Sequence, residues 1–226
     1  MKTQIAKLLL IFVAAVQLSA CAPLVVGGMV GGAMVASDRR SPGIQLEDEG
    51  IEQRSATAIR ENFGSKEHVN ITSYNRQVLI TGEVSTDTVR RQIESLIGRV
   101  ENVRAVVNEL VIGPASSTGD RANDVVLVAK VKASMVDTED VFANVFKVVG
   151  ERGTVYLMGR VTQREAKRAT DVVRGVSGVK RVVRVFEYIT EDDLRAMQPK
   201  RSDAQSVDLN APKSNASQQP VVTPIK

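Results

Sequence analysis

The sequence of 226 residues contains no tryptophan, one cysteine and one histidine, and aromatic residues make up only 4% of it. A single cysteine excludes an intramolecular disulfide, so stability must come from apolar cores. With His68 as the only histidine, a tetrahedral His and Cys metal site and a Cys–His pair are both excluded. We expect His68 to be solvated at the edge of a strand. Carboxylates are scattered and no glycine-rich phosphate loop is present, so the sequence predicts neither an enzyme nor a metal or cofactor site.

The first twenty residues have the pattern of a secretory signal peptide. Two lysines precede an apolar run over residues 8–16, and small residues follow it. A charged front, a short apolar stretch and a small-residue cleavage site distinguish such a segment from a membrane-spanning helix. We therefore expect residues 1–20 to be removed and the mature chain to start at Cys21.

The stretch Leu18-Ser19-Ala20-Cys21 resembles the lipobox of bacterial lipoproteins. This resemblance implies that Cys21 carries a diacylglyceryl group and an amide-linked acyl chain such as palmitate. Several acyl chains make a durable anchor, because each buried CH2 contributes about 0.8 kcal/mol. Ala22 stands where lipoproteins retained in the inner membrane have aspartate, which implies the periplasmic face of the outer membrane. An incidental or buried cysteine is the alternative.

The composition of the sequence distinguishes the globular units from the segments before, between and after them. Residues 22–36 are apolar and glycine-rich but shorter than the roughly twenty residues that span a bilayer, so we expect a flexible stalk over residues 21–46. Their G-x-x-x-G spacing leaves a dimerising membrane helix as the alternative. The breaker-rich residues 113–120 are typical of a linker. Residues 191–226 are polar, which predicts disorder because little apolar area offsets the ordering entropy.

An internal repeat occupies residues 47–112 and 121–190. The stretch VLITGEVSTDTVRRQ at residues 78–92 matches VYLMGRVTQREAKRA at residues 155–169, with a shared glycine. Each unit of about 65 residues is long enough for one small core. The chain is therefore predicted to form the same fold twice.

Upstream of this motif, the apolar spacing of the first helix aligns Ile59 with Val131. That alignment requires a loop five residues longer in the second copy. The pair Asn123-Asp124 is expected to start the helix of the second copy.

Periodicity changes in the same order in both copies. A helical segment precedes two alternating segments that form a hairpin, with Asn75 and Arg76 in the first turn. A second amphipathic helix follows, for which Thr162 and Glu165 predict a capping box in the second copy. A last strand ends each copy and runs parallel to its neighbour, because the crossover is helical. The predicted fold class is α+β, with two tandem α-β-β-α-β units that each place two helices on one face of a three-stranded mixed sheet.

The motif V-x-L-x-G-x-V, followed by V-x-x-V-x-x-V-V, resembles the BON domain of bacterial envelope proteins. Two such units behind a lipobox, with Asp38-Arg39-Arg40-Ser41 in the stalk, are similar to dual-BON outer-membrane lipoproteins. The resemblance covers residues 18–190. It implies a non-enzymatic protein that binds anionic phospholipid and helps maintain the outer membrane. The chain departs from the family in having no tryptophan, and aliphatic residues around Val126 stand where a membrane-contacting aromatic is expected.

The two units differ in charge. Residues 48–112 contain eight Lys or Arg and ten Asp or Glu, whereas residues 120–190 contain thirteen and nine. An anionic lipid surface attracts each nearby cation by about 1 kcal/mol, and a tether raises the effective concentration. We therefore predict a phospholipid-binding surface on the second unit. Its residues are Val126, Lys130, Lys132, Arg164, Lys167, Arg168 and Arg174.

Two alternatives remain open for this surface. One is that its cations are ordinary solvent-facing positions with local ion pairs. The other is that the protein is an interaction adaptor in envelope assembly that recognises no lipid headgroup. Whichever role the second unit has, we expect the first unit to contact a protein or to dock on the second unit. Nucleic acid fits a basic surface, but a secreted protein rarely meets it, so it is not an expected partner.

Overall fold

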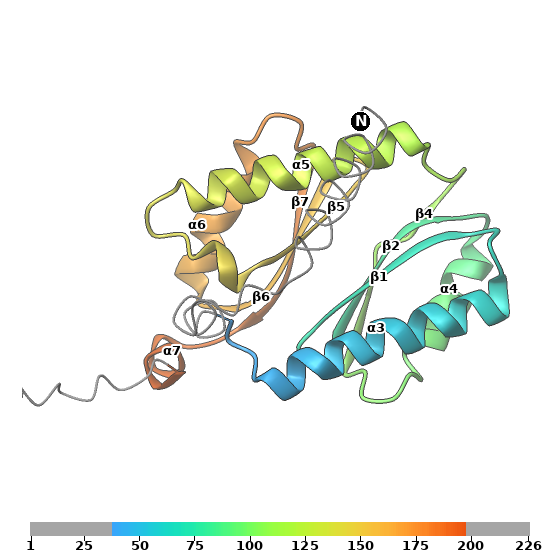
Figure 1. Cartoon of the computed structure of the whole chain (residues 1–226), viewed down its shortest axis with the longest axis horizontal. Coiled ribbons are helices and arrows are strands. Elements are labelled where there is room, and N and C mark those ends of the chain that lie inside the picture. The colour runs from blue at the N-terminus through green and yellow to red at the C-terminus, as the bar shows by residue number, and fades with distance from the viewer. Residues whose placement is uncertain (1–37, 198–226) are drawn as a thin grey trace, which may run out of the picture.

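The computed structural model describes residues 38–197, which form two units of similar architecture (Figure 1). Each unit has the predicted order α-β-β-α-β and a mixed sheet with two helices on one face. The α+β fold class is therefore confirmed. The predicted signal peptide, Cys21, the first part of the stalk and most of the polar tail lie outside the described residues. Within residues 38–197, no helix is both long enough and apolar enough to cross a bilayer.

The first unit contains two helices and four strands. Its elements are α3 (Pro42–Phe63), β1 (His68–Tyr74), β2 (Gln77–Val84), α4 (Asp87–Ile97), β3 (Ala105–Asn108) and β4 (Val111–Ile112). β1 and β2 form an antiparallel hairpin, and β3 and β4 both pair with β2 in parallel. The predicted single last strand is thus divided, because the Asn108 side chain accepts a hydrogen bond from the Leu110 amide at 3.1 Å and interrupts the ladder.

The second unit repeats this plan. Its elements are α5 (Thr118–Val136), η1 (Ala143–Val145), β5 (Lys147–Glu151), β6 (Thr154–Val161), α6 (Gln163–Arg174), β7 (Arg181–Tyr188) and α7 (Glu191–Met197). β5 and β6 are antiparallel, and β7 runs parallel to β6. This direction follows from the α6 crossover, since a helix between two strands returns the chain to the same end of the sheet.

Several helices begin earlier than the sequence pattern predicts. α3 starts at Pro42, inside the predicted stalk, because the Ser41 hydroxyl caps it and proline is favoured in the first turn. α5 starts at Thr118, inside the predicted linker, because Ser117 and Asp120 form a capping box. α7 likewise occupies the start of the predicted polar tail.

A buried aspartate on the first helix of each unit caps the hairpin turn. The Asp48 carboxylate accepts hydrogen bonds from both turn amides of the first hairpin at 2.8 and 2.7 Å. Asp124 accepts from those of the second at 2.8 and 2.9 Å. Asp48 and Asp124 are therefore equivalent, which aligns Ile59 with Met135. The predicted alignment with Val131 is wrong by one helical turn, because a shift of four residues preserves an apolar helical pattern.

The shared glycine of the repeat allows two strands to approach closely. A Cβ atom at Gly82, where φ is 115°, would lie 2.0 Å from the His68 carbonyl oxygen. A Cβ atom at Gly159 would lie 2.7 Å from the Val145 carbonyl oxygen. Both glycines are thus required by backbone packing within a unit.

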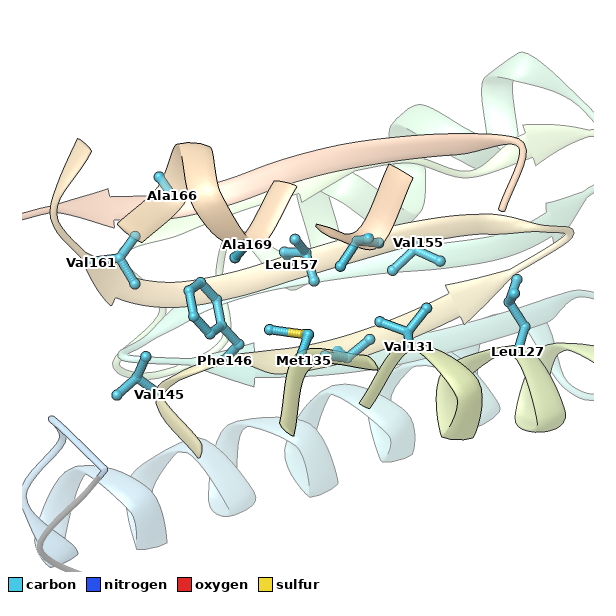
Figure 2. Packing of buried hydrophobic residues seen from close by; sticks show 12 residues of the cluster. Leu127, Val131, Met135, Val145, Phe146, Val155, Leu157, Val161, Ala166 and Ala169 are labelled. Carbon is cyan, nitrogen blue, oxygen red and sulfur yellow. The ribbon is translucent and has the colours of Figure 1, made fainter. Parts of the chain in front are cut away.

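Each pair of helices packs on its own sheet over a separate core. Figure 2 shows the second core, in which α5, α6 and β6 contribute Leu127, Val131, Met135, Val155, Leu157, Val161, Ala166 and Ala169. The first core contains Ile51, Ile59, Val78, Ile80, Val84, Ile93 and Ile97. Burial of each large aliphatic side chain contributes about 1.5–3 kcal/mol, so each unit has its own source of stability.

The opposite faces of the two sheets pack against each other. Side chains alternate along a strand, so Leu79 of β2 and Tyr156 and Met158 of β6 point away from the helices and join Tyr74 and Val185 in a third cluster. The molecule therefore has four layers, helix, sheet, sheet and helix (Figure 1). Docking of the first unit on the second, one of the alternatives open from the sequence, is what the structure shows.

Candidate functional site

The seven residues predicted to bind phospholipid lie on α5 and α6. These helices pack beside each other on the outer face of the second sheet (Figure 1). All seven side chains are exposed. The α6 residues lie on the outer face of the second unit, whereas Lys132 of α5 lines a cleft together with Gln45 of the first unit.

The outer face of α6 is cationic. Ala166 and Val173 are buried against the sheet, and the four cations lie on the opposite side because of their three- and four-residue spacing. The cations are Arg164, Lys167, Arg168 and Arg174. Asp171 lies among them, so four positive charges and one negative charge share this face.

Local ion pairs engage part of this face. Lys167 lies 2.7 Å from Asp171, Arg174 lies 3.9 Å from the same carboxylate, and Arg164 lies 3.6 Å from Glu191 of α7. All are exposed pairs, which contribute at most about 1 kcal/mol each. The other three cations of the predicted surface form no ion pair within residues 38–197. The three ion pairs are therefore too weak to prevent Lys167, Arg174 and Arg164 from binding another anion.

The outer face of α5 is apolar from Val125 to Val136, whereas the sequence predicts an apolar contact only around Val126. Val126 is 53% exposed, and Val125 and Val136 are 71% and 69% exposed. The exposed residues Ala129 and Ala133 lie between them. We call these five residues the apolar stripe. The signal for it in the sequence is that α5 has more apolar residues than one core-facing stripe requires.

Lys130 and Lys132 lie on opposite sides of the apolar stripe, since two positions along a helix are about 200° apart. Lys130 lines a cleft of about 440 Å³ together with Arg152 and Lys180. Lys132 lines a different cleft, beside Asp38. The structure therefore separates Lys132 from Lys130, and it places two further cations and the carboxylates of Asp120 and Asp124 on the Lys130 side.

The N-terminal segment joins the fold beside α5. Asp38, the first described residue, lines the same cleft of about 410 Å³ as Lys132, Val136 and Phe146. The chain that leads from Cys21 thus enters the folded part next to one end of the apolar stripe.

Arg39 binds the N-terminal end of α6. Its guanidinium donates hydrogen bonds to the two carboxylate oxygens of Glu165 at 2.6 and 2.8 Å, and to the Arg160 carbonyl oxygen at 2.7 Å. Both partners of this ion pair are nearly buried. Burial alone would raise the pKa of Glu165, but Arg39 and the Thr162 amide hold this pKa below its usual range.

Arg40 binds the first unit. Its guanidinium donates to Asp38 and Asp48 at 2.8 Å each and lies 4.2 Å from the centre of the Tyr74 ring. Consecutive arginines of the predicted stalk therefore bind different units. Residues 38–46 belong to the folded part, so the predicted boundary of the stalk at residue 46 lies too far along the chain.

His68 is hydrogen-bonded, and the prediction that it is solvated is wrong. Its Nδ1 atom lies 2.8 Å from Glu83 Oε2 and 3.4 Å from Ser116 Oγ. The fold brings these partners from the neighbouring strand and from the linker. A Ser–His–acid triad needs its serine and its carboxylate on different ring nitrogens. Because both partners face Nδ1, these three residues do not form one.

Comparison with known proteins gives a family for both units. The BON domain model matches residues 47–114 and 123–190. Each match contains one complete set of core strands and the helix between them.

Two relatives match most of the chain. Outer membrane lipoprotein DolP of Haemophilus influenzae is 37% identical over 185 residues, which cover 81% of this chain and 96% of that protein. The 21 kDa hemolysin of Actinobacillus pleuropneumoniae is 30% identical over 154 residues, which cover 67% and 79%. A solved structure of CdsD, a structural protein of the type III secretion system of Chlamydia trachomatis, has a TM-score of 0.27 at 12% identity, covering 69% of this chain and 98% of that one. The two BON matches and the 37% identity to DolP show that the chain belongs to the BON domain family, as a dual-BON protein of the DolP type.

Proposed function

We propose that the protein is an envelope lipoprotein, anchored by acylated Cys21 on the periplasmic face of the outer membrane, and that its α5–α6 surface binds anionic phospholipid and supports outer-membrane integrity. The observation that carries the proposal is the apolar stripe of α5 beside the cations of α6. Similarity to an outer membrane lipoprotein supports the location. The proposed activity is binding, without catalysis.

The apolar stripe and the cations suit the two layers of a membrane interface. An interfacial helix buries its apolar face about 5–10 Å into the headgroup and acyl boundary, while flanking cations meet the lipid phosphates. The exposed valines Val125, Val126 and Val136 supply that apolar area. Each cation near an anionic surface contributes about 1 kcal/mol, so the α6 cations favour anionic over neutral lipid.

The position of the N-terminal segment makes weak contact sufficient. Seventeen positions separate Cys21 from Asp38, and an extended chain of that length spans at most about 60 Å. An anchor this close keeps the surface at a high effective concentration near the lipid. The surface therefore needs little intrinsic affinity to remain in contact.

Vesicle flotation tests the surface apart from the anchor. The mature chain with Cys21→Ser retains every described residue and cannot be acylated. We expect it to float with vesicles that contain phosphatidylglycerol or cardiolipin and not with phosphatidylcholine alone, and to bind less as salt increases. The double variant Lys167→Glu, Arg168→Glu should bind more than about tenfold more weakly, since each lost cation removes about 1 kcal/mol.

The repeat offers a control at equivalent positions, which lowers the net charge by three, where the variant of α6 lowers it by four. The N-caps of α4 and α6 align Arg91 and Gln92 with Lys167 and Arg168. Arg91→Glu, Gln92→Glu should leave flotation unchanged, because α4 lies on the outer face of the first unit. Equal recovery with neutral and anionic vesicles, or equal losses in both double variants, would favour the adaptor role instead.

A further inference from the structure

A cluster of ionisable side chains lies where the two units and the linker meet. His68 begins β1, Glu83 lies near the end of β2, and Glu151 ends β5. One possible ligand atom from each of these three residues lies within 4.8 Å of the others. Ser116 of the linker is beside them. The proposed membrane surface does not use this cluster.

Glu83 is the buried centre of the cluster. Its Oε2 atom lies 2.8 Å from His68 Nδ1 and accepts a hydrogen bond from the Ser116 amide at 3.0 Å. Its Oε1 atom accepts from Arg152 of the second unit at 3.1 Å. The Arg152 side chain is about half exposed, so it is free to move into solvent.

Glu151 is nearly as buried and has fewer partners. It is 7% exposed. One carboxylate oxygen accepts a hydrogen bond from the Asn70 amide group at 2.8 Å. No residue in the described part of the chain donates to the other oxygen. Glu151 lines an open cleft of about 400 Å³ together with His68 and Asn70, so this carboxylate is accessible to a small ion.

The cluster lacks a positive charge at the point where its three side chains converge. Arg152 bonds only the far oxygen of Glu83, and nearby Arg121 donates to Ser116. Asp124 also lines the cleft, but each of its carboxylate oxygens already accepts a hydrogen bond from a turn amide. Glu83 is compensated by its donors, but Glu151 is nearly buried beside it with one oxygen that accepts no hydrogen bond from the described residues. A cation entering through the cleft would stabilise this carboxylate.

We propose that His68 Nδ1, Glu83 Oε2 and a carboxylate oxygen of Glu151 bind a divalent transition-metal ion of the Zn²⁺ class, which joins the two units beside the linker. One imidazole nitrogen and two carboxylate oxygens are a ligand set that suits Zn²⁺ better than Ca²⁺ or Cu⁺. The Ser116 hydroxyl or a water molecule is available as a fourth ligand.

Side-chain movements of at most about 1.5 Å bring the three ligand atoms, which lie within 4.8 Å of one another, to the spacing of a zinc site. Ligand atoms about 2.0–2.2 Å from Zn²⁺ lie roughly 3.3 Å apart in a tetrahedron, so the contact between His68 and Glu83 must lengthen slightly. The imidazole proton moves from Nδ1 to Nε2, which leaves a lone pair on the ligating nitrogen. No proton is lost from a neutral His68 in this change.

The sequence predicts no metal site, because it contains a single histidine and no free cysteine. Glu83 and Glu151 lie in different units and are brought together only when the two sheets pack. The carboxylate ligands were therefore not visible in the sequence.

Calorimetric titration of Zn²⁺ into the acylated mature chain in detergent, after treatment with chelator and at about pH 7.5, tests the proposal. We expect one ion per chain and weaker binding of Ca²⁺. Glu151→Gln and His68→Gln should each weaken Zn²⁺ binding by at least about tenfold. The control variant Glu139→Gln, an exposed acid in the loop after α5, should bind as the unchanged chain does.

A second measurement needs no variant and therefore does not depend on how the variants fold. Crystals of the unchanged chain grown with Zn²⁺ should give an anomalous difference peak between His68, Glu83 and Glu151. No binding of Zn²⁺, binding that neither variant weakens, or a peak elsewhere overturns the proposal.

Discussion

Asp48 is a single buried carboxylate on which four hydrogen bonds converge. They come from the Ser73 hydroxyl, the two turn amides and Arg40, at 2.7–2.8 Å. Burial alone would raise the pKa of Asp48, but these hydrogen bonds lower it. Three of the donors lie 25 to 28 positions along the chain. An aspartate near the start of a helix resembles an exposed residue in the sequence, so its role could not be predicted.

This environment predicts how stability depends on pH. The folded pKa of Asp48 lies below the unfolded value of about 3.9, so above about pH 5 the carboxylate is ionised in both states and its contribution is complete. As the pH falls through the unfolded pKa towards the folded pKa, the unfolded state takes up the proton first and stability is lost. We expect the free energy of unfolding, measured by urea denaturation, to fall less steeply between pH 5 and pH 3 in Asp48→Asn.

The difference in slope between Asp48→Asn and the unchanged chain measures the contribution of Asp48 to the pH dependence of stability. Glu83 and Glu165 also have lowered pKa values, so the variant should retain part of the slope. Asp87→Asn, which removes an exposed carboxylate of α4, should keep most of the original slope. Identical slopes in Asp48→Asn and the unchanged chain would show that this carboxylate has an ordinary pKa.

At the scale of helices and strands, local signals were predictable and long-range ones were not. The capping box of α6 was predicted from Thr162 and Glu165 and is confirmed, because both of its hydrogen bonds are made within four residues. The positions of the α6 cations on the outer face follow from the same helical period. The start of α5 was missed because its box uses Ser117 and Asp120, within a segment that has the composition of a linker.

The α6 capping box should be worth more than an ordinary exposed cap. Thr162 is buried, its hydroxyl accepts from the Glu165 amide at 3.4 Å, and its amide donates to the Glu165 carboxylate at 2.9 Å. We expect Thr162→Ala to lower the free energy of unfolding by about 1–2 kcal/mol, measured by urea denaturation at pH 7. Thr162→Ser keeps the hydroxyl and should lose much less. Equal losses in the two variants would assign the effect to the methyl group instead of the cap.

At the scale of the whole molecule, the repeat made two units predictable but not their arrangement. The continuous apolar runs of β2 and β6 are consistent with burial on both faces, yet they do not identify what covers the second face. The structure shows that each sheet covers the other. Arg39 and Arg40 then connect this assembly to the N-terminal segment, because each arginine binds a different unit.

Loss of Arg39 should therefore destabilise the assembly at the entry of that segment. Arg39→Ala leaves the nearly buried Glu165 without its cation. Breaking a buried pair in this way costs about 3–5 kcal/mol, and urea denaturation measures it. We also expect limited proteolysis to cut the chain faster near residue 39, since the variant removes the contacts to Arg160 and Glu165 that hold this backbone.

A second substitution separates the charge effect from lost packing. Adding Glu165→Gln to Arg39→Ala removes the uncompensated charge and should restore part of the stability, although the neutral amide cannot replace every hydrogen bond of the carboxylate. Arg91→Ala, which breaks an exposed pair with Asp87 on α4, should cost less than about 1 kcal/mol. If Arg39→Ala costs no more than Arg91→Ala, the ion pair does not hold the N-terminal segment to the second unit. The surface of α5 would then be brought to the membrane by the anchor alone.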